Sequence, residues 1–343
     1  MRMTFDRKLP IPQDTKTAIP IDEETKMAVS IKVNDIMDIL ENIDNRFLLI
    51  IGPCSADDES TVITYIMGLK TIQEQVKDKI LIVPRVYTEK PRSDLNEYKG
   101  LVHQPDPTSS PDLFEGIVAT RRIHMKVVKE TGFVAADEML YTENYKYIDD
   151  LLGYCAIGAR SAEDQQHILT ASAAECPVGI KNPMNGNLEA LTKAVKNAQE
   201  PHDFIYRGWA GYSHGNSYAH AILRGYTTRK GKMKSNYNYG DVLELKELFS
   251  KYNIKNTAVI IDCNHANSCK DPFEQIKIAQ TVAQYRELNS IGDFVKGIMV
   301  ESYIYDGRQD ISDGNYILGK SITDACLGWE KTMELINSIY EIL

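Results

Sequence analysis

Six cationic residues stand at or just beyond the ends of short β-branched stretches of the sequence. If they face one cavity, their mutual repulsion is costly unless anions are bound between them. Arginine forks and lysine point charges both suit phosphate groups and carboxylates. A single such cation is as often a salt-bridged surface residue as a ligand-binding one. Six cations in equivalent places instead favour a ligand with phosphate or several carboxylates. The six are Arg85, Lys90, Arg92, Arg160, Lys181 and Arg224.

A second set of residues combines one thiol, one imidazole and two carboxylates. This mixture of ligands suits a borderline divalent ion such as Mn, Fe, Co or Zn better than Mg or Ca. By spacing alone the indication is weak, because a lone histidine at a strand end is more often structural. A lone buried cysteine is likewise more often a small hydrophobe. The residues are Cys54, His265, Glu301 and Asp324.

The elements that must position both sets follow from the pattern of apolar residues. After residue 30, short β-branched runs alternate with segments of helical period, which predicts parallel strands joined by helices. Eight such units without an obvious boundary favour a closed (β/α)8 TIM barrel over a doubly wound sheet. The predicted strands are residues 47–51, 80–86, 133–138, 154–159, 177–181, 219–224, 258–262 and 295–301.

A barrel makes one site from these scattered residues. The carboxyl ends of the strands form a single face, where the active sites of such barrels lie. The first, seventh and eighth strands become neighbours when the sheet closes, which brings Cys54, His265 and Glu301 to the same part of that face.

Two segments depart from the alternating pattern. Residues 1–30 are polar, interrupted by prolines and weakly periodic, so we expect an extension that lies on the surface or on another subunit. Residues 31–343 then form the catalytic barrel. Within it, the glycine-rich residues 203–218 predict a hairpin inserted before the sixth strand, a candidate docking partner for the extension.

Composition excludes several classes of protein. With 39 basic and 48 acidic residues the formal net charge is −9, and no basic tail stands out, which argues against nucleic acid and anionic membranes as partners. No apolar run reaches the length of a membrane span, and the N-terminus lacks the apolar segment of a signal peptide, so we expect a cytoplasmic protein. The 6 cysteines are too sparse for a disulfide framework and are expected to be free thiols.

Taken in order, the motifs resemble those of the type I 3-deoxy-D-arabino-heptulosonate 7-phosphate (DAHP) synthases. The likeness is collinear from about residue 45 to residue 335, and the series is far more specific than any of its short pieces. The motifs are Gly52-Pro53-Cys54-Ser55, Arg85-Val86-Tyr87, Glu89-Lys90-Pro91-Arg92-Ser93, Ala156-Ile157-Gly158-Ala159-Arg160, Lys181-Asn182, Leu223-Arg224-Gly225, His265-Ala266-Asn267-Ser268, Val300-Glu301-Ser302 and Gly319-Lys320-Ser321-Ile322-Thr323-Asp324.

The resemblance implies a metal-dependent condensation of phosphoenolpyruvate with erythrose 4-phosphate and water, the first step of the shikimate pathway. It also implies a homodimer or homotetramer, one divalent metal ion (Mn, Fe, Co or Zn) and the following roles. Phosphoenolpyruvate would be bound by Gly158, Ala159, Arg160, Lys181 and Arg224, with Arg85 and Lys90 near its carboxylate and reacting carbon. The sugar phosphate would be bound by Arg92 and Ser93, the metal by Cys54, His265, Glu301 and Asp324, and Glu138 and His167 match further active-site positions.

Two of these residues are assigned chemical roles, and His265 and Asp324 join them in the catalytic set. Lys90 is expected to protonate the developing alkoxide, with its pKa lowered toward neutrality by Arg85 and Arg92. Glu138 is expected to orient the attacking water. His167 could equally be a capped structural residue of a helix.

Other readings remain open at this point. A related synthase that joins phosphoenolpyruvate to a larger aldose, of the 3-deoxy-octulosonate 8-phosphate type, would share the barrel, although Lys90-Pro91-Arg92-Ser93 argues against it. Lys181 at a strand end could instead form a Schiff base, as in metal-independent aldolases. A catalytically silent barrel that senses aromatic amino acids is a third alternative, and feedback regulation itself is left undecided.

Overall fold

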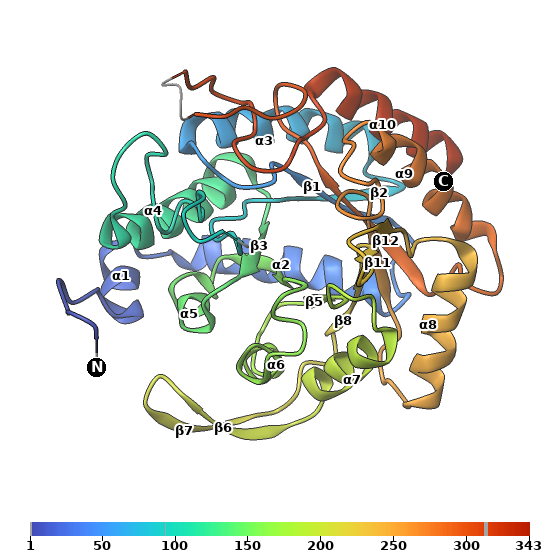
Figure 1. Ribbon diagram of the computed structural model, residues 1–343, viewed down its shortest axis with the longest axis horizontal. Coiled ribbons are helices and arrows are strands. Elements are labelled where there is room, and N and C mark those ends of the chain that lie inside the picture. The colour runs from blue at the N-terminus through green and yellow to red at the C-terminus, as the bar shows by residue number, and fades with distance from the viewer. Residues whose placement is uncertain (1, 93, 312–314) are drawn as a thin grey trace.

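The central element is a parallel sheet of eight strands that curves into a barrel (Figure 1). The computed structural model describes residues 2–92, 94–311 and 315–343. The strands follow one another in the order β2-β1-β12-β11-β8-β5-β4-β3, and a bridge between Arg85 and Ala136 joins the two ends. The predicted (β/α)8 fold is confirmed. The strands are β1 (Phe47–Gly52), β2 (Ile80–Pro84), β3 (Ala135–Met139), β4 (Leu152–Ile157), β5 (Val178–Lys181), β8 (His220–Leu223), β11 (Val259–Asp262) and β12 (Val295–Glu301).

The strands are buried on both faces, which explains their continuous apolar sequences. In β1, Leu48 and Ile50 belong to the cluster inside the barrel, whereas Leu49 and Ile51 belong to the layer beneath the helices. Gly297 in β12 shows how closely the strands approach, because a Cβ atom there would lie 2.0 Å from the carbonyl oxygen of Leu48. The barrel is therefore a packed core, and only its carboxyl end is open to chemistry.

Helices cover the outside of the barrel, and several begin at an acidic or amide cap. The side chains of Asp58, Asp112, Asp164 and Asn187 each accept a backbone N–H of the first turn that follows. The helices are α3 (Glu59–Val76), α4 (Leu113–Lys126), α5 (Tyr145–Ile148), α6 (Gln165–Ser172), α7 (Leu188–Gln199), α8 (Tyr239–Lys251), α9 (Glu274–Gln284) and α10 (Trp329–Ile342), with a π-helical turn at Val127–Thr131 and 3-10 turns at Thr142–Asn144 and Tyr285–Glu287.

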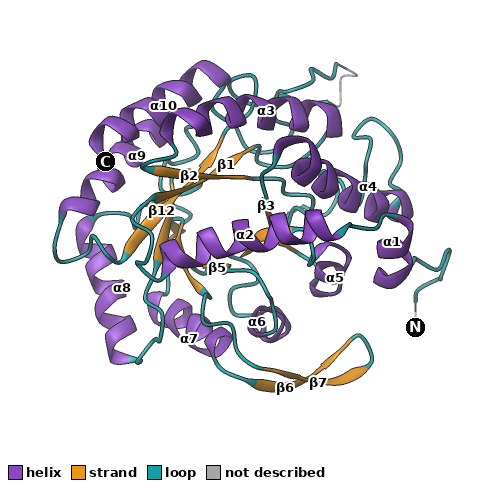
Figure 2. Ribbon diagram, turned by 180° about the vertical axis from the view of Figure 1, so that it is seen from behind, coloured by secondary structure: helices purple, strands orange, loops and turns teal. Residues whose placement is uncertain are grey.

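The N-terminal segment forms two helices, α1 (Pro12–Ala18) and α2 (Glu23–Leu40). Helix α2 runs across one end of the barrel (Figure 2), where Ile36 and Ile39 join the apolar cluster of the barrel interior. It crosses residue 30, so one continuous helix links the predicted extension to the predicted barrel segment. Helix α1 lies beside α5, and the hydroxyl of Tyr147 donates to the carbonyl of Pro10 at 2.6 Å.

The inserted hairpin is formed by β6 (His202–Tyr206) and β7 (Trp209–Ser213), which pair antiparallel at the periphery (Figure 1). The turn residues Arg207 and Gly208 both have positive φ, 52° and 80°, as a tight two-residue hairpin turn requires. A second, short hairpin of β9 (Tyr226–Thr227) and β10 (Met233–Lys234) follows β8. None of the helices in the described residues is both long and apolar enough to cross a lipid bilayer.

Candidate active site

A polar pocket of about 300 Å³ opens at the carboxyl end of the barrel. Ten of the predicted site residues line it: Lys90, Arg92, Glu138, Gly158, Ala159, Arg160, Lys181, Arg224, His265 and Asp324. They lie at the carboxyl ends of seven different strands or in the loops that follow them, so the barrel alone brings them together. Ser93 lies outside the described residues.

Five of the six predicted cations face this pocket, and the sixth lies beneath it. Arg85 is fully buried, with its guanidinium stacked 3.9 Å from the ring centre of Tyr87 and one amino group 3.0 Å from Glu301. The Nε and Nη1 atoms of Arg85 have no hydrogen-bond partner among the described residues. Two buried donors beside a cationic pocket are an unusual cost, which an anionic ligand would remove.

The cations also affect one another. Burial lowers the pKa of the Arg224 guanidinium, and the positive charge of Arg160 lowers it further. The backbone N–H of Arg224 donates to Asn182 Oδ1 at 2.9 Å, and the Asn182 amide in turn donates to the carbonyl of Gly225. Several cations thus lie close together in the pocket, and binding of phosphate would reduce their repulsion.

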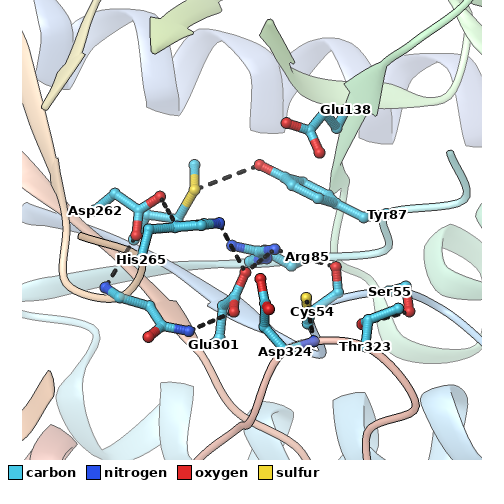
Figure 3. A network of polar contacts seen from close by, with 12 residues as sticks. Cys54, Ser55, Arg85, Tyr87, Glu138, Asp262, His265, Glu301, Thr323 and Asp324 are labelled. Carbon is cyan, nitrogen blue, oxygen red and sulfur yellow. Dashed lines mark hydrogen bonds and ion pairs between the residues drawn. The ribbon is translucent and has the colours of Figure 1, made fainter. Parts of the chain in front are cut away.

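The proposed metal ligands converge at one side of the pocket (Figure 3). Ligand atoms of Cys54, Glu301 and Asp324 all lie within 4.8 Å of one another. Nε2 of His265 is 3.7 Å from a carboxylate oxygen of Glu301, and the side chain comes from the loop after β11. One sulfur, one nitrogen and two carboxylates in this space fit a borderline divalent cation such as Mn, Fe, Co or Zn.

The surroundings of these ligands also fit a cation. Burial, reinforced by the negative charge of Glu301, raises the pKa of the Cys54 thiol to about 11, so a bound cation is needed to hold the thiolate at neutral pH. His265 has a positive φ of 54°, an uncommon conformation for a residue other than glycine. Its Nδ1 atom is 2.8 Å from Asp262, which leaves Nε2 as the ligand atom.

One electrostatic expectation is wrong. Arg85 and Arg92 do not bring the pKa of Lys90 toward neutrality. Burial of the ammonium would lower that pKa, but the Cys54 sulfur in its ionised form and the carboxylates of Glu301 and Glu138 outweigh burial and raise it above its usual value. The Nζ atom donates to the carbonyl of Cys54 at 3.0 Å and lies 4.0 Å from Glu301. Lys90 is therefore an ammonium ion at neutral pH.

Glu138 lies opposite the metal ligands, beyond the ring of Tyr87 (Figure 3). Its carboxylate accepts a hydrogen bond of 2.9 Å from Lys181. Burial alone would raise the pKa of Glu138, but the ammonium groups of Lys181 and Lys90 lower it to about 2. Glu138 is thus ionised at neutral pH and can accept, but not supply, a proton in a hydrogen bond.

His167 is not brought to the pocket. One ring nitrogen lies 2.6 Å from Asp164 and the other 3.0 Å from the carbonyl of Leu140, so both are engaged in the packing of α6. The prediction that His167 contacts substrate is not supported by this geometry. The structural role that the sequence left open accounts for its contacts.

The pocket also contains charged residues that the sequence analysis missed. Lys270 and Arg308 line it, and Lys270 is 3.1 Å from Asp324. Glu97 lines it too and pairs with Arg92. All three lie on long loops, where no periodicity marks them. The only sequence signal is proximity, since Lys270 follows His265 by five residues and Glu97 follows Arg92 by five.

The six cysteines are free, as predicted, and Cys54 alone among them belongs to the candidate metal group in the described residues. The remaining buried thiols, such as Cys155 and Cys263, behave as small apolar residues of the core.

Comparison with known proteins places the chain in a family. Residues 18–337 match the model of the DAHP synthetase I family. The Tyr-sensitive phospho-2-dehydro-3-deoxyheptonate aldolase of Salmonella typhimurium is 33% identical over 100% of this chain and 95% of the relative. The Phe-sensitive enzyme of Escherichia coli K12 is 36% identical over 88% of this chain and 85% of the relative. A solved phospho-2-dehydro-3-deoxyheptonate aldolase from Francisella tularensis SCHU S4 matches with a TM-score of 0.91 at 30% identity, over 99% of this chain and 98% of that one. This chain therefore belongs to the DAHP synthetase I family.

Proposed function

We propose that this chain condenses phosphoenolpyruvate with D-erythrose 4-phosphate and water, giving 3-deoxy-D-arabino-heptulosonate 7-phosphate and inorganic phosphate. This is the first step of the shikimate pathway, which leads to the aromatic amino acids. Family membership over nearly the whole chain supports the reaction. The observation that carries it in this structure is the single pocket where five of the predicted cations face a cluster of metal-ligand residues.

In this proposal the cations divide between the two substrates, and most of them bind phosphoenolpyruvate. Its phosphate is bound by Arg160, Lys181 and Arg224, and the backbone of Gly158 and Ala159 lies beside these cations. Its carboxylate lies toward Arg85, which has two buried nitrogen donors, Nε and Nη1, without a hydrogen-bond partner among the described residues. The phosphate group of the sugar is bound by Arg92 and by the hydroxyl of Ser93, the residue that follows in the family motif.

Cys54, His265, Glu301 and Asp324 would hold one divalent cation, Mn, Fe, Co or Zn. When bound, this cation supplies a Lewis acid that polarises the carbonyl of the sugar. Arg85 and Lys90 support the same cluster, since both lie within 4.0 Å of a Glu301 oxygen. Their positive charges keep the Glu301 carboxylate ionised and oriented.

Two residues of the chain take part in the proton transfers of the reaction. The enol carbon of phosphoenolpyruvate forms the new bond to the sugar's aldehyde carbon, and Lys90 donates a proton to the alkoxide that develops there. Water then adds to the carbon that carries the phosphate ester. Glu138 orients that water through its ionised carboxylate. The hemiketal loses phosphate by C–O cleavage, so the water oxygen stays in the product as the ketone.

Release of phosphate tests this proposal. Purified protein with Mn²⁺ and phosphoenolpyruvate should release inorganic phosphate only when erythrose 4-phosphate is added. A chelator should abolish the activity and Mn²⁺ should restore it. Activity with a five-carbon aldose phosphate but not with the tetrose would favour the related synthase. Activity that survives chelation, with inactivation by borohydride, would favour a Schiff base at Lys181, and silence with both substrates and metal would contradict the proposed reaction.

A further inference from the structure

One carboxylate in the pocket has no role in the chemistry just described. Of the acidic residues that line the pocket, Glu138 pairs with Lys181 and Asp324 belongs to the metal cluster. The third is Glu97, which lies on the loop between β2 and α4. Its carboxylate oxygen Oε2 accepts from Nε of Arg92 at 2.8 Å and lies 2.7 Å from Nη2 of the same guanidinium.

The pairing uses the part of Arg92 that a phosphate would use. Nε and one Nη of an arginine are the edge that binds two oxygens of an oxyanion side by side. Here both of these nitrogens are turned to one carboxylate oxygen of Glu97. The carboxylate thus occupies the position, and imitates the charge, of an anionic ligand on Arg92.

The backbone presents Glu97 to Arg92 without holding the pair firmly. The N–H of Glu97 donates to the carbonyl of Asp94 at 3.3 Å, which makes a turn, and the Tyr98 hydroxyl anchors the following residue to the carbonyl of Ala56 at 3.1 Å. The Glu97 side chain itself is 49% exposed and that of Arg92 15% exposed. An ion pair this open to water is weak, so a dianionic phosphate can displace it.

We propose that Glu97 is an internal competitor for the sugar-phosphate position on Arg92 and determines which anions bind there. Small anions such as inorganic phosphate, a product of the reaction, must displace Glu97 with phosphate contacts alone. The sugar phosphate has additional contacts in the pocket that offset this cost. The inference rests on the proposed function in one respect, the assignment of Arg92 to the sugar phosphate.

Removal of the Glu97 charge should therefore improve binding at one subsite only. In Glu97→Gln the KM for erythrose 4-phosphate should fall about twofold to fivefold, the range expected for loss of an exposed ion pair. The inhibition constant of inorganic phosphate competing with the sugar should fall at least as much. The KM for phosphoenolpyruvate and kcat should stay within about twofold, since the ion pair of Glu97 is with Arg92, on the sugar-phosphate side of the proposed site.

Asp94→Asn is the matched control. It removes the same charge from the same loop, but Asp94 does not line the pocket and its side chain accepts from the N–H of Asn96 instead. Asp94→Asn should change neither constant, whereas Glu97→Asp, which keeps the charge, should remain close to the wild type. In an Arg92→Gln background, Glu97→Gln should have no further effect, which locates the competition on Arg92.

The outcomes separate this inference from the proposed reaction. An unchanged or higher KM for the sugar phosphate in Glu97→Gln overturns it, because Glu97 would then be neutral or would position Arg92 for binding. Equal effects of Glu97→Gln and Asp94→Asn also overturn it, because they would indicate a general field effect. If the wild type fails to condense the two substrates, the reaction is wrong. A calorimetric titration with inorganic phosphate then still decides the role of Glu97, with tighter binding by Glu97→Gln supporting competition and unchanged binding refuting it.

Discussion

At the scale of single residues, Lys90 illustrates how burial and neighbouring charge oppose each other. Burial should deprotonate a lysine, but Lys90 faces the Cys54 sulfur, which raises its pKa when ionised, and the carboxylates of Glu301 and Glu138, and together these keep its pKa above the usual value. The ammonium form is therefore the resident form at the pH of the cell. Such a group serves as a proton donor and as a fixed positive charge, and not as a base.

The first prediction concerns this donor. Lys90→Met keeps the length of the side chain and removes both the proton and the charge, so kcat should fall at least about 100-fold, the usual contribution of a positioned acid. Lys99→Met is the control, because Lys99 carries the same change on the same loop and does not line the pocket. Steady-state kinetics on folded variants provide the measurement. Turnover equal to the wild type in Lys90→Met would remove Lys90 from the mechanism.

A second prediction concerns Asp262, which is fully buried and lies 2.8 Å from Nδ1 of His265 (Figure 3). The negative charge of this carboxylate favours a proton on Nδ1, which would leave Nε2 free to bind the proposed metal ion. Asp262→Asn retains the shape and loses the charge, so the dissociation constant for Mn²⁺ should rise by on the order of tenfold to a hundredfold.

Electron paramagnetic resonance of free Mn²⁺ measures this constant without reference to activity. Asp293→Asn serves as the control, since the exposed Asp293 precedes β12, at the opposite end of the barrel strands from the site. An affinity equal to the wild type in Asp262→Asn would limit Asp262 to a packing role.

At the scale of elements, β8 carries a buried histidine inside the barrel. His220 is fully buried, with one ring nitrogen 2.8 Å from the Tyr154 hydroxyl and the other 2.8 Å from the Tyr218 carbonyl. Burial lowers its pKa from 6.5 to about 4. The unfolded chain therefore binds a proton between these values that the folded chain does not, and stability falls as the pH is lowered through this window.

The expected result for His220 follows from that sign. Between pH 7.5 and pH 5 the wild type should lose about 2 kcal/mol of unfolding free energy through His220. His220→Gln should lack this part of the loss, whereas His214→Gln, at an exposed position, should keep it. Urea unfolding at the two pH values provides the comparison. Parallel losses in the wild type and His220→Gln would show that His220 does not control this pH dependence.

At the scale of the whole molecule, the hairpin of β6 and β7 exposes large apolar side chains. Ile205 is 76% exposed, Trp209 77% and Tyr212 59%, on an element that lies at the periphery (Figure 1). The register places Ile205 and Tyr212 on one face of the hairpin and Trp209 on the other, and large apolar side chains exposed in this way mark interaction sites. We propose that this hairpin contributes to the homodimer or homotetramer that the family resemblance implies.

Light scattering after size exclusion tests the assembly. The wild type should have the mass of a dimer or tetramer, and Ile205→Ser with Trp209→Ser should reduce the mass or make it depend on concentration. Met67→Ser changes an apolar residue of α3 that is 44% exposed and should leave the mass unchanged. A monomeric wild type, or a double variant that keeps its assembly, would contradict the role of the hairpin.

The positions of the strands could be predicted from the sequence because a strand buried on both faces is a continuous run of apolar residues. A run such as Phe47–Ile51 is apolar at every position, and it is bounded by polar residues. The inserted hairpin could be predicted for a similar reason, because its glycines interrupt the alternation. The paired residues are 202–213, close to the predicted 203–218. Helix α2, in contrast, crosses the predicted boundary at residue 30, since most of its residues before that boundary are exposed and carry little apolar period.

For the site, the sequence showed which residue types are present. It did not show which side chains lie next to one another or how deeply they are buried. Cys54, His265, Glu301 and Asp324 are separated by up to hundreds of residues, so only closure of the barrel puts their ligand atoms side by side. The pKa of Lys90 depends on distances between different strands and loops, and the pairing of Glu97 with Arg92 depends on how one loop folds back on itself. Chemical identity, apolar period and motif order are local properties of a chain, whereas Coulomb energy and desolvation depend on separation in space. The sequence by itself therefore determined the family, the barrel and the candidate groups, and the tertiary structure decided which groups meet and in what charge state.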